Sequence, residues 1–230
     1  MKKQFLLLFV ISLTFGKAFS QQDPVNSNSE QYLTNKPIFI PKDKDYRGSH
    51  YENETFEKGI IYMNDTPVAV NVGVRYNALR DEIEIKENLA LPENTARVLV
   101  KSPTIYVRSL NKIFVYEPQT EGLESAGYLQ LLFEGENLNL YKKITKEFVE
   151  GMESVNSITG DVPAMFKQNE TYLLNRKKQN TFEALESSKR KRIDALGVSK
   201  KEIKSFLKDK DLNIKREDGL IKTVKFVDTL

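Results

Sequence analysis

The sequence predicts an α+β protein, in which an antiparallel β-meander of about eight strands is followed by C-terminal helices packed on the sheet. Apolar and polar residues alternate with a period of two from residue 56 to about residue 146, and this period is typical of strands. After residue 180 the apolar residues change to helical spacing. The chain has 230 residues, 40% of them hydrophobic, which is enough to bury a sizeable core.

The predicted strands are short apolar runs separated by turn and loop residues. Ile83 and Ile85 alternate with Glu82 and Glu84, so we expect the two glutamates to form a solvent-facing polar stripe. Strict alternation also places one apolar stripe on a single face, formed by Val68, Val70, Val72, Val74 and Tyr76. Further runs lie at residues 60–63, 98–100, 105–107, 113–116, 128–133 and 138–141. Few of the gaps are long enough for a helix, which favours antiparallel hairpins.

Helical signals dominate the C-terminal segment. Asn180 with Glu183, and Ser199 with Glu202, have the spacing of a capping box, which marks a helix N-terminus. The apolar residues that follow predict helices near 181–196, 199–208 and 217–228. We expect an antiparallel β domain at 46–175 and a basic helical part at 176–230 that is integral to the same fold.

The first twenty residues have the features of a secretory signal peptide. Lys2 and Lys3 precede an apolar run that ends at Ala18-Phe19-Ser20, before Gln21. The run is shorter than the roughly 20 apolar residues of a membrane-spanning helix, so we expect cleavage and no transmembrane segment in the mature chain. The sequence thus predicts export to the periplasm, the outer membrane or the medium, with a flexible polar lead-in at 21–45.

Composition and motifs exclude several kinds of chemistry. The chain has no Cys and one His, His50, which excludes Cys nucleophiles, thiolate zinc sites and multi-histidine metal centres. Its place near the polar lead-in, without a partner residue for catalysis, predicts an exposed, inert imidazole. The sequence also lacks the glycine-rich phosphate-binding loops and the motifs of the common hydrolases. We therefore predict a non-enzymatic protein with no catalytic residue, no cofactor and no metal site.

Arg75, Tyr76, Asn77 and Arg80 form the densest polar and aromatic cluster on the predicted sheet. They are a candidate recognition face. We favour a structural interpretation, in which Arg75 pairs with a carboxylate on a neighbouring strand and Asn77 lies in a turn.

A second candidate surface is the basic run Lys189, Arg190, Lys191 and Arg192. It lies in a segment, 175–230, with 16 basic and nine acidic residues. The run is either a patch for an anionic partner, such as a lipid headgroup, a polysaccharide or an acidic protein, or a solvated helix face.

Some segments resemble an uncharacterised exported family of Bacteroidota. They are Gln21-Gln22 at the expected mature start and the stretches 56–61, 74–84, 188–192 and 201–208. The resemblance covers about residues 50–230 of the chain. It implies an exported location and transfers no activity and no catalytic residue.

Three functions are compatible with these features. The leading hypothesis is an exported, non-enzymatic cell-envelope protein that either binds a partner, such as an envelope protein or a glycan, or serves as a structural module. Nucleic acid is excluded because an exported chain does not meet it. The second is a periplasmic carrier of an apolar, lipid-like ligand, with the valines at 68–74 lining a half-barrel cavity. The third is a hydrolase with a carboxylate pair such as Glu82 and Glu84.

We expect the mature chain to begin at Gln21, because Ala18 and Ser20 are the small residues that signal peptidase requires before the cut. The intact mass of the exported protein should equal that of residues 21–230. An Ala18→Arg variant should retain its leader. A mature start displaced by more than a few residues would contradict the prediction.

Overall fold

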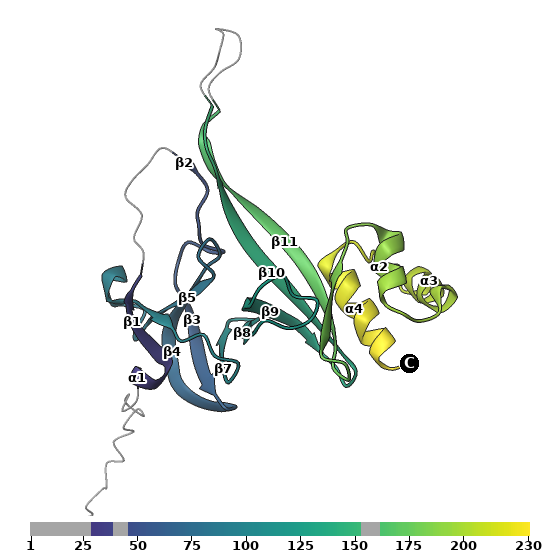
Figure 1. Cartoon of the computed structure of the whole chain (residues 1–230), viewed down its shortest axis with the longest axis horizontal. Helices are drawn as coiled ribbons and strands as arrows, with labels where there is room; N and C mark the ends of the chain where they lie inside the picture. The colour runs from purple at the N-terminus through teal and green to yellow at the C-terminus, as the bar shows by residue number, and fades with distance from the viewer. Residues whose placement is uncertain (1–28, 39–45, 153–161) are drawn as a thin grey trace, which may run out of the picture.

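The computed structural model describes residues 29–38, 46–152 and 162–230 (Figure 1). The predicted signal peptide, and Phe39 and Ile40 of the lead-in, lie outside these residues. The strands are β1 (Leu33–Pro37), β2 (Tyr46–Arg47), β3 (Glu57–Met63), β4 (Thr66–Asn77), β5 (Glu82–Lys86), β6 (Arg97–Leu99), β7 (Ile105–Ser109), β8 (Lys112–Glu117), β9 (Gly127–Glu134), β10 (Leu138–Val149), β11 (Ala164–Arg176) and β12 (Thr181–Leu185). The helices are α1 (Ser29–Tyr32), α2 (Lys189–Ala195), α3 (Lys200–Asp209) and α4 (Glu217–Asp228), with a 3₁₀ turn at Glu93–Thr95.

The α+β class predicted from the sequence is confirmed, but the simple eight-strand meander is wrong. One sheet holds 12 strands in the order β1-β6-β5-β4-β3-β7-β8-β9-β10-β11-β12, with β2 beside β11. β3 pairs with both β4 and β7, so the chain crosses over three strands between β6 and β7. β2 pairs with β11 in parallel, which makes the sheet mixed. In Figure 1, β10 and β11 form a long ribbon that extends beyond the other strands.

The segment predicted as a helix from residue 181 begins instead as strand β12. Asn180 adopts a left-handed φ of 50° and closes a hairpin, in which Tyr172 of β11 is opposite Leu185 of β12. The capping-box spacing at Asn180 was therefore misleading, because pairing with β11 stabilises the extended form of 181–185. The predicted helices at 199–208 and 217–228 are confirmed by α3 and α4, and Ser199 accepts a hydrogen bond from the Glu202 N–H at 3.5 Å.

The alternation in β4 is interrupted by a β-bulge. Consecutive residues of β3 are opposite Val72 and Val70, so Asn71 is an extra residue, with a φ of 59°. The faces exchange at this point: Val72 and Ala69 are buried, whereas Val70 is 43% exposed. The prediction of one continuous valine face is therefore wrong, because one added residue moves every side chain before it to the other face.

The C-terminal helices share a core with the sheet. Ile203 and Leu207 of α3 and Leu220 of α4 belong to one buried cluster with Leu140 of β10 and Leu174 of β11. None of the helices in the described parts of the chain is long and apolar enough to cross a membrane.

Asp228, at the end of α4, fixes that helix to the β9–β10 turn. Its carboxylate accepts hydrogen bonds from the backbone N–H groups of Glu136, Asn137 and Leu138 at 2.7–2.8 Å. These three bonds lower the pKa of Asp228, outweighing the effect of burial, which raises it.

The carboxylate of Asp81 joins the two halves of the sheet. Three strands lie between β4 and β9 in the sheet order, yet Asp81, which follows β4, accepts hydrogen bonds from Tyr76 Oη at 2.7 Å and Tyr128 N at 3.1 Å. The Lys143 ammonium on β10 lies 2.7 Å away. Burial raises the pKa of Asp81, but Lys143 and the Tyr76 hydroxyl lower it further, so the net shift is downward. A Cβ on Gly127 would lie 2.5 Å from the Asp81 carboxylate, so this contact requires glycine there.

The described part of the lead-in is packed against the sheet. β1 pairs with β6, and Tyr32 and Leu33 are only 3% and 4% exposed. The prediction that His50 is exposed is wrong: it is 3% exposed, and its ring lies 3.8 Å from that of Tyr51. Burial, and then the positive charge of Arg75, lowers the pKa of His50 to about 4.

We expect Asp81→Asn to lower the free energy of unfolding by about 2–3 kcal/mol, because it leaves the partly buried Lys143 ammonium without its counter-ion. Urea denaturation followed by circular dichroism measures this. The matched control is Asp65→Asn, since Asp65 is exposed and has the same left-handed backbone conformation. Equal stability of the two variants would contradict the role assigned to Asp81.

We expect stability to fall as the pH drops from about 6.5 to 4, because in that window the unfolded chain binds a proton at His50 that the folded chain does not. Protonation of His50 in the unfolded chain should lower the free energy of unfolding by about 3 kcal/mol across this window, and His50→Gln should abolish this part of the pH dependence. Since the chain has one His, its imidazole resonance can be followed by NMR without ambiguity. A titration midpoint near 6.5 would refute the prediction.

Candidate functional site

The candidate recognition face on the sheet is not a surface of the folded protein. Arg75, Tyr76 and Asn77 are at most 2% exposed, and only Arg80 reaches solvent. Tyr76 packs into the core, and the Asn77 side chain accepts a hydrogen bond from the Arg80 N–H at 3.1 Å, as expected of a turn residue. A partner therefore cannot contact these residues as a group.

Arg75 lies in a buried polar network instead. Its guanidinium binds the Glu84 carboxylate on β5 at 2.9 Å, which confirms the predicted pairing with a neighbouring strand. The rings of Tyr51 and Phe56 flank the guanidinium at 3.7 and 4.1 Å, and Arg75 also donates to the Glu54 carbonyl at 2.9 Å. Arg75 therefore fixes the segment before β3 to the sheet.

Glu82 and Glu84 do not form the predicted solvent-facing stripe. They are 7% and 0% exposed, because the segment before β3 and strand β1 cover this face. Glu84 is held by Arg75, and Glu82 is paired with Lys36 of β1 and with Arg80. Burial raises the pKa of Glu84, against the opposing effect of Arg75. Each carboxylate thus has its own cation, an arrangement unlike two carboxylates facing a substrate across a cleft.

The valines expected to line a ligand cavity are part of a packed core. Val72 and Val74 are 4% and 3% exposed and belong to one cluster with Ile61, Ile83 and Phe114. These side chains come from strands on both sides of β4. Their apolar surface is therefore already covered by other strands of the sheet.

The basic run at residues 189–192 divides into structural and exposed members. Arg192 is 5% exposed, donates to the carbonyls of Ile214 at 2.7 Å and Glu186 at 2.8 Å, and so joins α2 to the α3–α4 connection. Lys191 is exposed and paired with the Glu186 carboxylate at 2.6 Å. Lys189 and Arg190 are exposed as well. The four residues are therefore not a continuous patch.

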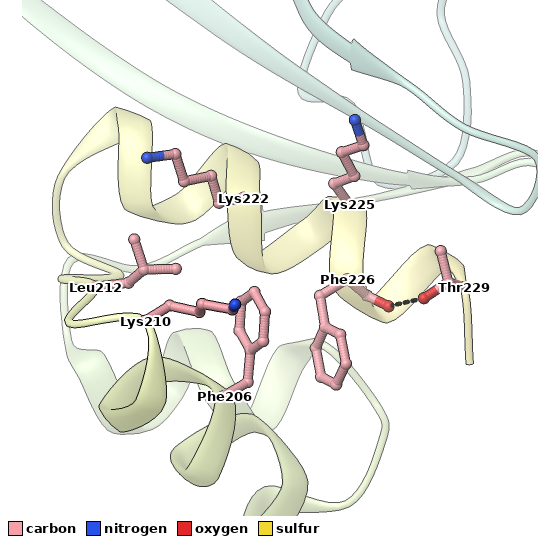
Figure 2. A pocket seen from close by; sticks show the side chains of 7 residues that line it. All are labelled: Phe206, Lys210, Leu212, Lys222, Lys225, Phe226 and Thr229. Atoms are coloured by element: carbon pink, nitrogen blue, oxygen red, sulfur yellow. Dashed lines mark hydrogen bonds between the residues drawn. The ribbon is translucent and has the colours of Figure 1, made fainter.

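A hollow of about 490 Å³ lies between α3 and α4, and we call it the α3–α4 groove (Figure 2). Its lining combines apolar and basic side chains: Phe206, Lys210, Leu212, Lys222, Lys225, Phe226 and Thr229. The connection between the two helices folds tightly, since a Cβ on Gly219 would lie 2.2 Å from the Asn213 carbonyl oxygen. Ile214 lies within this connection, and its side chain is fully buried in the core that α3 and α4 share. These two residues set the spacing of α3 and α4.

Phe206 and Phe226 form the floor of the groove. Their rings are stacked, with centroids 4.2 Å apart and an interplanar angle of 4°. Figure 2 shows the two rings facing one another from α3 and α4. Both side chains are half-buried, so part of their apolar surface remains open to a ligand.

Three lysines give the groove its charge. Lys210 ends α3, and Lys222 and Lys225 lie three residues apart on α4. All three are exposed, and no acidic side chain within the described ranges lies within salt-bridge distance of their ammonium groups. Figure 2 shows the Lys210 ammonium beside the Phe206 ring, whereas the ammonium groups of Lys222 and Lys225 extend away from the two rings. This lining suits a ligand that is apolar where it meets the rings and anionic where it reaches the lysines.

The α3–α4 groove was not predicted from the sequence. Helical spacing assigned Phe206 to the helix core, and the lysines are scattered along the chain rather than grouped in a run. A signal was present in the excess of basic residues over acidic ones at 175–230. No protein-family model, no curated protein and no solved structure matches this chain, so the assignment of a function depends on the geometry of its own residues.

Proposed function

We propose that the protein is an exported, non-enzymatic cell-envelope protein that binds an acidic partner protein through the α3–α4 groove. The observation that carries the proposal is the combination of the stacked Phe206 and Phe226 rings with three lysines that form no salt bridge among the described residues. The signal-peptide features of residues 1–20 support the location.

An acidic polypeptide fits this groove better than a glycan does. Sugars bind to aromatic residues through an open ring face, whereas Phe206 and Phe226 cover one another's inner faces at 4.2 Å. A polypeptide offers a Leu or Phe side chain for the floor and Asp or Glu side chains for Lys210, Lys222 and Lys225. One segment of the partner then supplies both the apolar side chain and the carboxylates.

Typical free energies of such contacts indicate how strongly the groove alone could bind a partner. One large apolar side chain buried on the floor contributes about 1.5–3 kcal/mol, and each exposed ion pair about 0.2–1 kcal/mol. Loss of translational and rotational freedom opposes binding by about 4–15 kcal/mol. The groove therefore serves as an anchor within a larger interface, for which neighbouring surfaces of the helices are available.

We expect a variant with Lys210→Gln, Lys222→Gln and Lys225→Gln to capture acidic partners from envelope extract about threefold to a hundredfold less than the wild type, since three lost ion pairs of about 0.2–1 kcal/mol each reduce affinity. Affinity capture with quantitative mass spectrometry measures the change. Capture by the wild type should also weaken at about 0.5 M salt, because exposed charges are then screened.

A second triple variant, Lys58→Gln, Lys167→Gln and Lys178→Gln, is the matched control, because these lysines are exposed and lie outside the groove. It should capture partners as the wild type does. Both variants should keep their melting temperature. Repeated recovery of no partner, or equal capture by the two triple variants, would refute the proposal.

A further inference from the structure

A second hollow, of about 600 Å³, lies between α2 and α3, on residues that do not line the α3–α4 groove. We call it the α2–α3 hollow; Figure 1 shows the two helices next to each other. Its lining is mostly charged: Lys189, Arg190, Ile193, Asp194, Lys200 and Lys204. Ile193 is 3% exposed and forms an apolar base.

The local backbone explains why these charges converge. Gly197, with a φ of 70°, reverses the chain after α2, and Ser199 caps the start of α3. Lys200 and Lys204 are four residues apart and therefore lie on one side of α3. The same spacing on α2 relates two other lining residues, Arg190 and Asp194. The two helices thus present cations to the same space.

The hollow already holds one anion of the chain itself. The Asp194 carboxylate is paired with the Lys200 ammonium at 2.7 Å and with the Arg190 guanidinium at 4.0 Å. The Lys200 hydrogen bond is the main cause of the lowered pKa of Asp194, and Arg190 and Lys204 add to it. Cations from α2 and α3 therefore stabilise the negative charge of one group, the Asp194 carboxylate.

Four cations and one carboxylate line the hollow, so three positive charges are left without an anion in the lining. A phosphoryl group carries about −1.5 to −2 charges at neutral pH and has three strong acceptor oxygens. A single carboxylate carries one charge and two oxygens, and would leave more of the positive charge uncompensated. The hollow is also large enough for a phosphoryl group together with part of the molecule that bears it.

We propose that the α2–α3 hollow binds a phosphoryl group, carried by a lipid headgroup or by a soluble phosphate, and that Asp194 competes with it for Lys200 and Arg190. The inference goes beyond the proposed function, because it concerns different lysines and a different chemical class. The inference would remain valid if the α3–α4 groove bound no protein. Conversely, a failure to bind phosphate in the α2–α3 hollow would not bear on the proposed function of the groove.

Two variants with opposite expected effects test the inference on the full mature chain. Lys200→Gln with Lys204→Gln should weaken phosphoryl binding about tenfold, because two of the four cations are lost. Asp194→Asn should tighten binding about threefold or more, because it removes the competing carboxylate while keeping the side-chain shape. The matched controls are Asp209→Asn, on an exposed carboxylate of α3 outside the hollow, and Lys58→Gln with Lys178→Gln, on exposed lysines that line neither the hollow nor the α3–α4 groove.

Two probes distinguish the sources of the phosphoryl group. Inorganic phosphate is titrated by NMR at low ionic strength, and co-sedimentation compares phosphatidic acid vesicles, whose headgroup is a phosphomonoester, with phosphatidylcholine vesicles. Response to phosphate indicates a soluble ligand, and response to phosphatidic acid vesicles alone indicates a lipid headgroup. Either result supports the site, provided that the variants at residues 194, 200 and 204 shift it in the expected directions.

Three outcomes would overturn the inference. The first is that neither probe binds. The second is that Asp194→Asn fails to tighten binding, or tightens it no more than Asp209→Asn does. The third is that the Lys58 and Lys178 variant loses as much binding as the Lys200 and Lys204 variant, which would indicate binding to the general positive charge of the surface. Melting curves of all variants identify any loss that comes from unfolding.

Discussion

The carboxylate of Asp81 holds the sheet in its curled form. It collects donors from the Tyr76 hydroxyl, the Tyr128 backbone and the Lys143 ammonium, which belong to β4, β9 and β10. These strands meet because the sheet curves until β4 and β9 come together around one core. Gly127 is needed for the same contact, since any Cβ there would displace the carboxylate. The position of the C-terminal helices follows, because α4 packs on β9 and β10.

Charge inside the sheet has a structural role rather than a recognition role. The pair formed by Arg75 and Glu84 is buried, and the guanidinium is enclosed by the rings of Tyr51 and Phe56. Removing either partner would leave an uncompensated buried charge, so the pair constrains how the segment before β3 lies on the sheet. The richest polar cluster in the sequence is therefore unavailable to a partner, and the exposed cations that we propose as binding groups lie on the C-terminal helices or directly beside them.

The basic residues of the helices differ in what they contact. Arg192 is buried and binds backbone carbonyls, and Lys191 is paired with Glu186. The lysines of the α3–α4 groove have no such partner within the described residues, and those of the α2–α3 hollow surround a single carboxylate. The net positive charge of this segment is thus concentrated at two concave places, one with an aromatic floor and one with mainly charged walls.

Local patterns were enough to predict the α+β class, the strands between residues 60 and 141, and helices α3 and α4, because alternation and capping depend on near neighbours in the chain. They did not predict the crossover from β6 to β7, the strand at 181–185 or the burial of Glu84, which depend on contacts between distant segments. The bulge at Asn71 shows the limit most simply, since one extra residue exchanged the two faces of β4. The total charge could be calculated from the composition, whereas the positions of the lysines around the two hollows depend on how α2, α3 and α4 pack. Packing brings together residues that are far apart in the chain, and a pattern read over a few neighbouring residues contains no information about which distant segments will meet.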